Sequence, residues 1–80
     1  MTTEKQRDFA AKLYRELGEI APELSETDAL TVTEVLTPVG DSIQPTLTGE
    51  ASGASASAVI DHLITALKTS KELLGVVEYR

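Results

Sequence analysis

Apolar residues recur every three or four positions in the first part of the chain. The series consists of Ala10, Leu13, Leu17, Ile20 and Leu24. This spacing places the side chains on one face of an α-helix. Thr2 or Thr3 can cap its start, because a threonine hydroxyl accepts a hydrogen bond from the free N–H groups of a first turn. Pro22 cannot continue the backbone ladder. The pattern therefore predicts a helix over about residues 3–21.

A second apolar series with alternating steps of four and three occupies the last third of the chain. It consists of Ala56, Ile60, Leu63, Leu67, Ser70, Leu74 and Val77. Val59 and Ile64 widen this face beyond a coiled-coil seam, which favours a packed bundle. Ser55 or Ser57 can cap the start, and Gly75 is a natural residue to follow the last turn. We predict a helix over about residues 57–74.

The middle of the chain has a mixed pattern. Ser25 followed by Asp28 is typical of a helix start, and apolar residues from 29 to 36 fit helical spacing. Threonine and valine dominate residues 31–37, however, and β-branched side chains favour strands. Residues 28–37 therefore stay open between helix and strand. Pro45 and two glycines interrupt residues 44–56, which we predict to be a mobile loop rich in Ser, Thr, Gly and Pro.

These elements predict one small all-α domain over residues 1–80. We expect a helical bundle with two main antiparallel helices, 3–21 and 57–74, joined by a shorter helical or irregular middle. An α+β fold is the alternative, in which residues 30–36 pair as a strand with residues 76–79.

Charge is distributed unevenly along the chain. The 80 residues hold 13 Asp or Glu against 7 Lys or Arg, and residues 16–67 contain no Lys or Arg at all. An acidic stretch of this length repels phosphate backbones and anionic lipid surfaces, so we expect neither direct nucleic-acid binding nor membrane binding. Because the chain shows no long apolar run and no signal-peptide pattern, we expect a cytoplasmic protein.

Acidic residues at steps of two to six positions form the candidate partner-binding surface. They are Glu16, Glu19, Glu23, Glu26, Asp28 and Glu34. Such a row can simply keep a small protein soluble, or it can dock a basic partner. The composition, without Asn and rich in Ala, Thr and Glu, is typical of a GC-rich bacterial or bacteriophage source. We expect a non-enzymatic protein-interaction module of the small accessory or inhibitor type.

Residues that carry chemistry are scarce. The chain has no Cys and a single histidine, His62, and it lacks both a calcium-loop pattern and a phosphate-binding glycine motif. We therefore expect no catalytic residue, no metal site and no cofactor.

The tetrapeptide Gly40-Asp41-Ser42-Ile43 resembles the D-S-L/I motif of acyl and peptidyl carrier proteins. In that family the serine bears a phosphopantetheine arm, so the resemblance implies Ser42 as an attachment site. The short length, the acidic balance and the leading amphipathic helix agree with it. The family places a long acidic helix after the serine, whereas this chain has Pro45 and Gly49 there. A carrier-like protein is the alternative function.

The apolar face of the C-terminal helix is wider than one partner helix covers. Exposed apolar patches of this kind are usually closed by a second copy, most often about a two-fold axis. We therefore expect a homo-oligomer, specifically a dimer. Its interface includes Ile60, Leu63, Ile64, Leu67 and Leu74.

Overall fold

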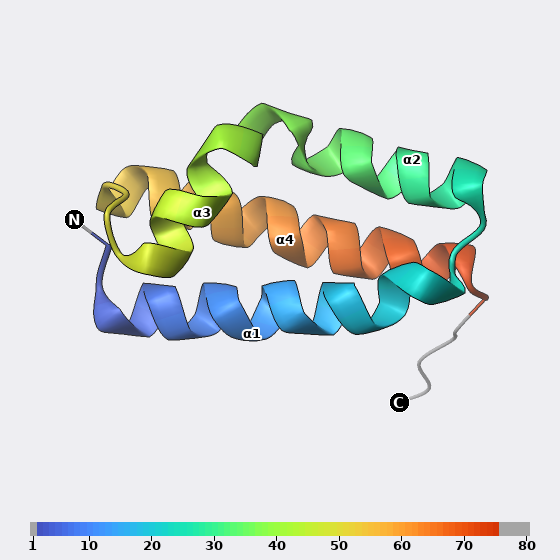
Figure 1. Cartoon of the computed structure of the whole chain (residues 1–80), viewed down its shortest axis with the longest axis horizontal. Coiled ribbons are helices and arrows are strands. Elements are labelled where there is room, and N and C mark those ends of the chain that lie inside the picture. The colour runs from blue at the N-terminus through green and yellow to red at the C-terminus, as the bar shows by residue number, and fades with distance from the viewer. Residues whose placement is uncertain (1, 76–80) are drawn as a thin grey trace.

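The computed structural model describes residues 2–75, and four α-helices form most of that range (Figure 1). They are α1 (Glu4–Ile20), α2 (Glu26–Leu36), α3 (Gly40–Thr48) and α4 (Gly53–Leu73), with 3-10 turns at Ala21–Glu23 and Thr37–Val39. The predicted all-α bundle is confirmed. The α+β alternative is wrong, because residues 30–36 are helical; its second strand, residues 76–79, lies outside the described residues.

The two longest helices run parallel, not antiparallel as predicted (Figure 1). The Gln6 amide nitrogen of α1 donates to the Gly53 carbonyl oxygen at 3.2 Å and to the Ser57 hydroxyl oxygen at 3.1 Å. The Thr2 hydroxyl donates to the Ala51 carbonyl oxygen at 2.6 Å. Both helices therefore start at the same end of the bundle. The antiparallel prediction failed because α2 and α3 together carry the chain back to the start of α1 before α4 begins.

Local signals set the ends of α1 and α4. Thr3 caps α1 in a capping box with Gln6, and the helix ends at Ile20, before a 3-10 turn that contains Pro22. The cap of α4 is Ser52, whose hydroxyl accepts from the Ser55 N–H. This helix therefore begins four residues before the predicted start.

Threonine hydroxyls make the Thr-rich segment compatible with a helix. Three of them donate to the carbonyl oxygen four residues earlier, in the pairs Thr31–Thr27, Thr33–Ala29 and Thr37–Thr33, at 2.9–3.2 Å. Such back-bonding satisfies the hydroxyl inside a helix. The Ser25 hydroxyl caps the start by accepting from the Asp28 N–H. Residues 28–37 are therefore helical up to Leu36, and Thr37 opens the next 3-10 turn.

Helix also replaces most of the predicted loop over residues 44–56. α3 continues to Thr48 and α4 starts at Gly53, so only residues 49–52 lie between them. Ile43 and Leu47 pack against the core and Thr46 is fully buried, which offsets the loss of one backbone donor at Pro45. Gly49, at φ 87°, then ends α3 in the left-handed conformation.

Helix α4 lies at the centre of the bundle and packs against the other three helices. The bundle measures 37 × 29 × 17 Å. The shortest of these dimensions corresponds to at most about two helix diameters, so α1 and α2 each keep one face in solvent. The buried apolar cluster is Ala10, Leu13, Leu17, Val32, Val39, Val59, Leu63, Ala66 and Leu67.

Candidate functional site: an acidic surface and two exposed apolar residues

The net charge of the chain resides between α1 and α4. Helix α1 contains four acidic and four basic side chains, and α4 contains two of each. Residues 21–52 have no cation and carry the six carboxylates of Glu23, Glu26, Asp28, Glu34, Asp41 and Glu50. The formal charge of −6 therefore equals the charge of this segment alone.

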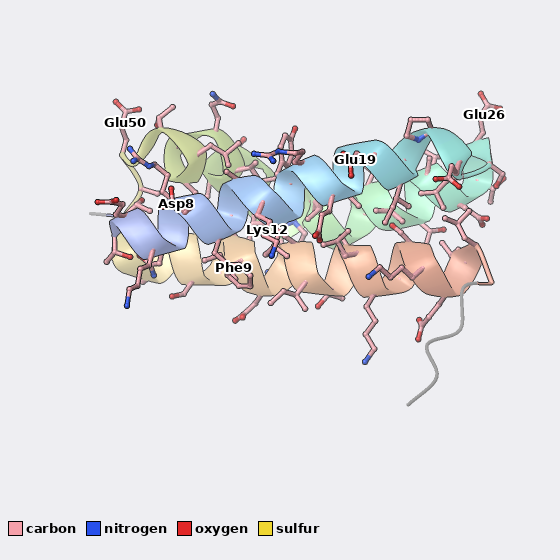
Figure 2. All side chains as sticks on the ribbon, turned by 90° about the horizontal axis from the view of Figure 1, so that it is seen from below. Asp8, Phe9, Lys12, Glu19, Glu26 and Glu50 are labelled. Atoms are coloured by element: carbon pink, nitrogen blue, oxygen red, sulfur yellow. The ribbon has the colours of Figure 1, made fainter. Side chains whose placement is uncertain are left out.

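Four of the six predicted partner-binding residues gather at one end of the bundle. Glu19 lies in the last turn of α1, Glu23 in the following 3-10 turn, and Glu26 and Asp28 in the first turn of α2. Figure 2 shows Glu19 on the outer side of α1 and Glu26 at the tip of the bundle. Glu34 is eight residues beyond Glu26, about 12 Å along the helix axis. Together with half-buried Glu16, these residues form what we call the acidic surface.

The carboxylates of the acidic surface have no partner among the described residues. None of the six accepts a hydrogen bond or forms an ion pair there. Glu19, Glu23, Glu26 and Glu34 are exposed, and Glu16 and Asp28 are half-buried. The fold therefore leaves these negative charges free to meet a cation from outside the described chain.

Two of these carboxylates stand at unfavourable places in their helices. Glu19 and Glu34 lie in the last turns of α1 and α2, and neither turn contains a basic residue. Unpaired carbonyl groups make a helix C-terminus negative, so an anion there costs about 0.3–1 kcal/mol. Glu26 and Asp28 lie instead at the start of α2, where the helix dipole stabilises a negative charge.

The structure divides the predicted oligomer interface. Leu63 and Leu67 are 0% and 6% exposed, so they belong to the core of the single chain and cannot contact a second copy. That part of the prediction is wrong because three helices, rather than one, pack on α4. Ile60 and Leu74 are half-buried, and Ile64 is 43% exposed.

Two further exposed apolar side chains lie on different helices. Phe9 is 44% exposed on α1, on the side of that helix that faces α4 (Figure 2). Leu30 is 65% exposed on α2, between Glu26 and Glu34. Leu30 was not among the residues predicted for the site. The signal was that Leu30 lies outside the apolar series of α2, in which Val32 and Leu36 face the core.

Ser42 lies half-buried near the start of α3. Its carbonyl oxygen accepts a hydrogen bond from the Thr46 hydroxyl at 2.7 Å. α3 ends six residues after Ser42, so the long helix that carrier proteins place after the serine is a short one here. His62 lies in α4, where its Nδ1 is 2.7 Å from the Ala58 carbonyl oxygen.

An open polar hollow of about 310 Å³ separates the start of α1 from the end of α3. Arg7 and Glu4, which have opposite charges, both line it, and the remaining lining residues are Thr2, Thr3, Thr48 and Gly49.

Among residues 2–75 no three His, Cys, Asp or Glu side chains are grouped so that they can hold a metal ion. No helix in this range is long and apolar enough to cross a membrane. No protein family, curated protein or solved structure matches the chain.

Proposed function

We propose that this protein is a non-enzymatic interaction module whose acidic surface docks a basic surface on a protein partner. The net charge of −6 resides on residues 21–52, and the exposed carboxylates there have no cationic partner within the described chain. Charge complementarity of this kind steers two proteins together and fixes their orientation.

The placement of Glu19 and Glu34 carries the proposal. Charge that serves only solubility can stand at any exposed position, including helix starts, where it also stabilises the helix. Glu19 and Glu34 instead stand at helix ends that lack a basic residue. A positively charged partner removes this local cost, and the free energy gained then contributes to binding.

The size and charge agree with a small bacterial or bacteriophage accessory or inhibitor protein that works in the cytoplasm as a homo-oligomer. Such a protein can imitate the phosphates of a nucleic acid and occupy a basic surface in their place. The proposal therefore places the partner among proteins with an exposed cluster of Lys and Arg.

The test is direct titration of decalysine into the chain by calorimetry, followed by the same measurement on basic proteins captured from the host. The variant E19Q/E26Q/E34Q removes three charges from the acidic surface. The matched control E4Q/D61N/E72Q removes three exposed charges elsewhere. We expect at least about a tenfold loss of affinity for the first variant, at about 0.5 kcal/mol per lost contact, and less than about twofold for the control.

Salt provides the second measurement. The Debye length falls from ~10 Å at 0.1 M to ~3 Å at 1 M ionic strength, so binding must weaken over this range. Equal losses of affinity in the two variants, or binding that does not change with salt, would mean that the acidic surface serves only solubility.

A further inference from the structure

Two exposed rows of side chains on α1 and α2 have matching spacing and opposite charge. On α1, Phe9 lies between two lysines one turn away on either side; on α2, Leu30 lies between two glutamates one turn away on either side. We call Lys5, Phe9 and Lys12 the basic row, and Glu26, Leu30 and Glu34 the acidic row. All six side chains are exposed.

The two rows have nearly the same length. At 1.5 Å per residue, Lys5 and Lys12 are about 10.5 Å apart along α1, and Glu26 and Glu34 are about 12 Å apart along α2. When the two helices lie side by side, Phe9 therefore meets Leu30 while a lysine meets a glutamate at each end. Within one copy the rows stay apart, because α4 packs between α1 and α2 (Figure 1).

Apolar surface from α4 extends the basic row. Ser57 faces α1, since its hydroxyl accepts from Gln6. Ile64 lies two turns beyond Ser57 on the same side of α4, which places it along the seam with α1. Ile64 is 43% exposed, and Phe9 lies on the α4 side of α1 (Figure 2). The seam therefore offers more apolar surface to an incoming side chain than Phe9 alone.

We propose that a second copy of this chain is a partner of the acidic surface, and that its basic row docks on the acidic row of the first copy. The inference rests on the proposed function, because Glu26 and Glu34 serve both. Pairing like rows about a two-fold axis brings lysine to lysine or glutamate to glutamate. Pairing unlike rows is attractive, either in one head-to-tail contact or in two contacts about a two-fold axis, with the basic row of each copy on the acidic row of the other.

Asp8 and Glu16 lie one turn from Lys12 on either side and cancel the formal charge of Lys5 and Lys12, so the attraction is limited to the individual lysine–glutamate contacts (Figure 2 labels Asp8). The contact is also small, and interfaces well below about 1,200 Å² in total are weak. The association is therefore a weak and reversible one, seen at high protein concentration and low salt.

Charge exchange tests the proposal by sedimentation velocity. Variant K5E/K12E has two acidic rows, and variant E26K/E34K has two basic rows. We expect the sedimentation coefficient of the natural chain to rise with concentration and that of each variant alone to stay constant. An equimolar mixture of the two variants restores opposite charges at every contact, so its sedimentation coefficient must rise again.

Matched controls change the same number of charges away from the rows. R7E/R15E replaces the other two cations of α1, and E50K/E72K replaces two exposed glutamates of the loop and of α4. Both controls must associate like the natural chain. The substitutions F9A and L30A must each abolish the rise in sedimentation coefficient, whereas Y14A, at another exposed aromatic residue of α1, must not.

A constant sedimentation coefficient for the natural chain overturns the inference, as does a mixture that fails to associate. Association of E26K/E34K alone also overturns it, because the basic rows would then pair with each other. These results are distinguishable from failure of the proposed function. A chain that stays monomeric but binds decalysine through Glu19, Glu26 and Glu34 retains the docking of a basic partner and loses the homo-oligomer.

Discussion

The side chains of Gln6 and Ser57 join α1 to α4 through a hydrogen bond of 3.1 Å between amide nitrogen and hydroxyl oxygen. The same amide nitrogen donates to the Gly53 carbonyl oxygen, and the amide oxygen accepts from the Thr3 N–H at 3.0 Å. One side chain therefore completes the cap of α1 and aligns the starts of two parallel helices that are about fifty residues apart in the sequence.

Replacing Gln6 with Ala removes all three hydrogen bonds at once. Each net hydrogen bond contributes about 0.5–1.5 kcal/mol, and exposure to solvent places these near the lower limit, so we expect a loss of about 1–2 kcal/mol in the free energy of unfolding. The measurement is urea denaturation followed by circular dichroism. Gln44→Ala, at an exposed glutamine of α3, is the control and must leave the midpoint within the error.

Neutralising acidic residues must change stability in opposite directions at the two ends of a helix. Glu19→Gln and Glu34→Gln remove an anion from a helix C-terminus, so each raises the free energy of unfolding by about 0.3–1 kcal/mol. Glu26→Gln removes an anion from the start of α2 and lowers it by a similar amount. Thermal melts at low ionic strength measure the differences, which must shrink in high salt. A gain in stability for Glu26→Gln would contradict the helix-dipole argument.

Local patterns in the sequence predicted the helices better than they predicted their arrangement. The periodic apolar residues of α1 and the capping threonine identified that helix to within a residue at its start. The α2 segment stayed ambiguous because propensity scales count Thr31 and Thr33 as strand formers, whereas their hydroxyls here bond to carbonyl oxygens of the preceding turn. The spacing of Val39, Ile43 and Leu47 is the helical signal that the loop prediction overlooked.

The periodicity of apolar residues could not predict how the helices pack against one another. A stripe of apolar residues shows that α4 must be covered, but it does not say how many helices cover it. Leu63 therefore looked available for a second copy and is instead fully buried by the chain itself. The direction of α4 relative to α1 depends on whether the middle segment returns the chain, and this required α3 to be recognised. Charge, by contrast, follows directly from the sequence; in the structure Glu26 and Glu34 of α2 are exposed and Asp28 is half-buried.

Truncating Leu63 tests the assignment of this residue to the core of a single chain. A fully buried leucine replaced with Ala costs about 2–5 kcal/mol, a large fraction of the stability of so small a domain. We expect Leu63→Ala to lose most of its helical circular dichroism at 37 °C at every protein concentration. Ile64→Ala, one residue away and 43% exposed, must lower the melting temperature far less. If higher protein concentration restores the helical signal of Leu63→Ala, Leu63 contributes to an interface between copies.

Two glycines allow a final prediction in which the same substitution has opposite signs. Gly18 lies inside α1, and a Cβ atom there meets no atom within 4 Å. Gly49 has φ 87°, in the left-handed region that L residues disfavour, and its conformation ends α3. Gly18→Ala must therefore raise the free energy of unfolding by about 0.5–1 kcal/mol, because alanine restricts the unfolded chain and favours the helix.

Gly49→Ala must lower the free energy of unfolding by about 1–2 kcal/mol, since the added Cβ strains the left-handed backbone. The nearest atom to that Cβ is Arg7 Cδ at 3.7 Å, an ordinary contact distance, so backbone strain rather than a steric clash accounts for the loss. Gly49→Asn separates the two causes, because asparagine is larger than alanine but tolerates the left-handed region better. It must destabilise less than Gly49→Ala in thermal melts. The reverse order would mean that space beside Arg7, and not the conformation at Gly49, limits this turn.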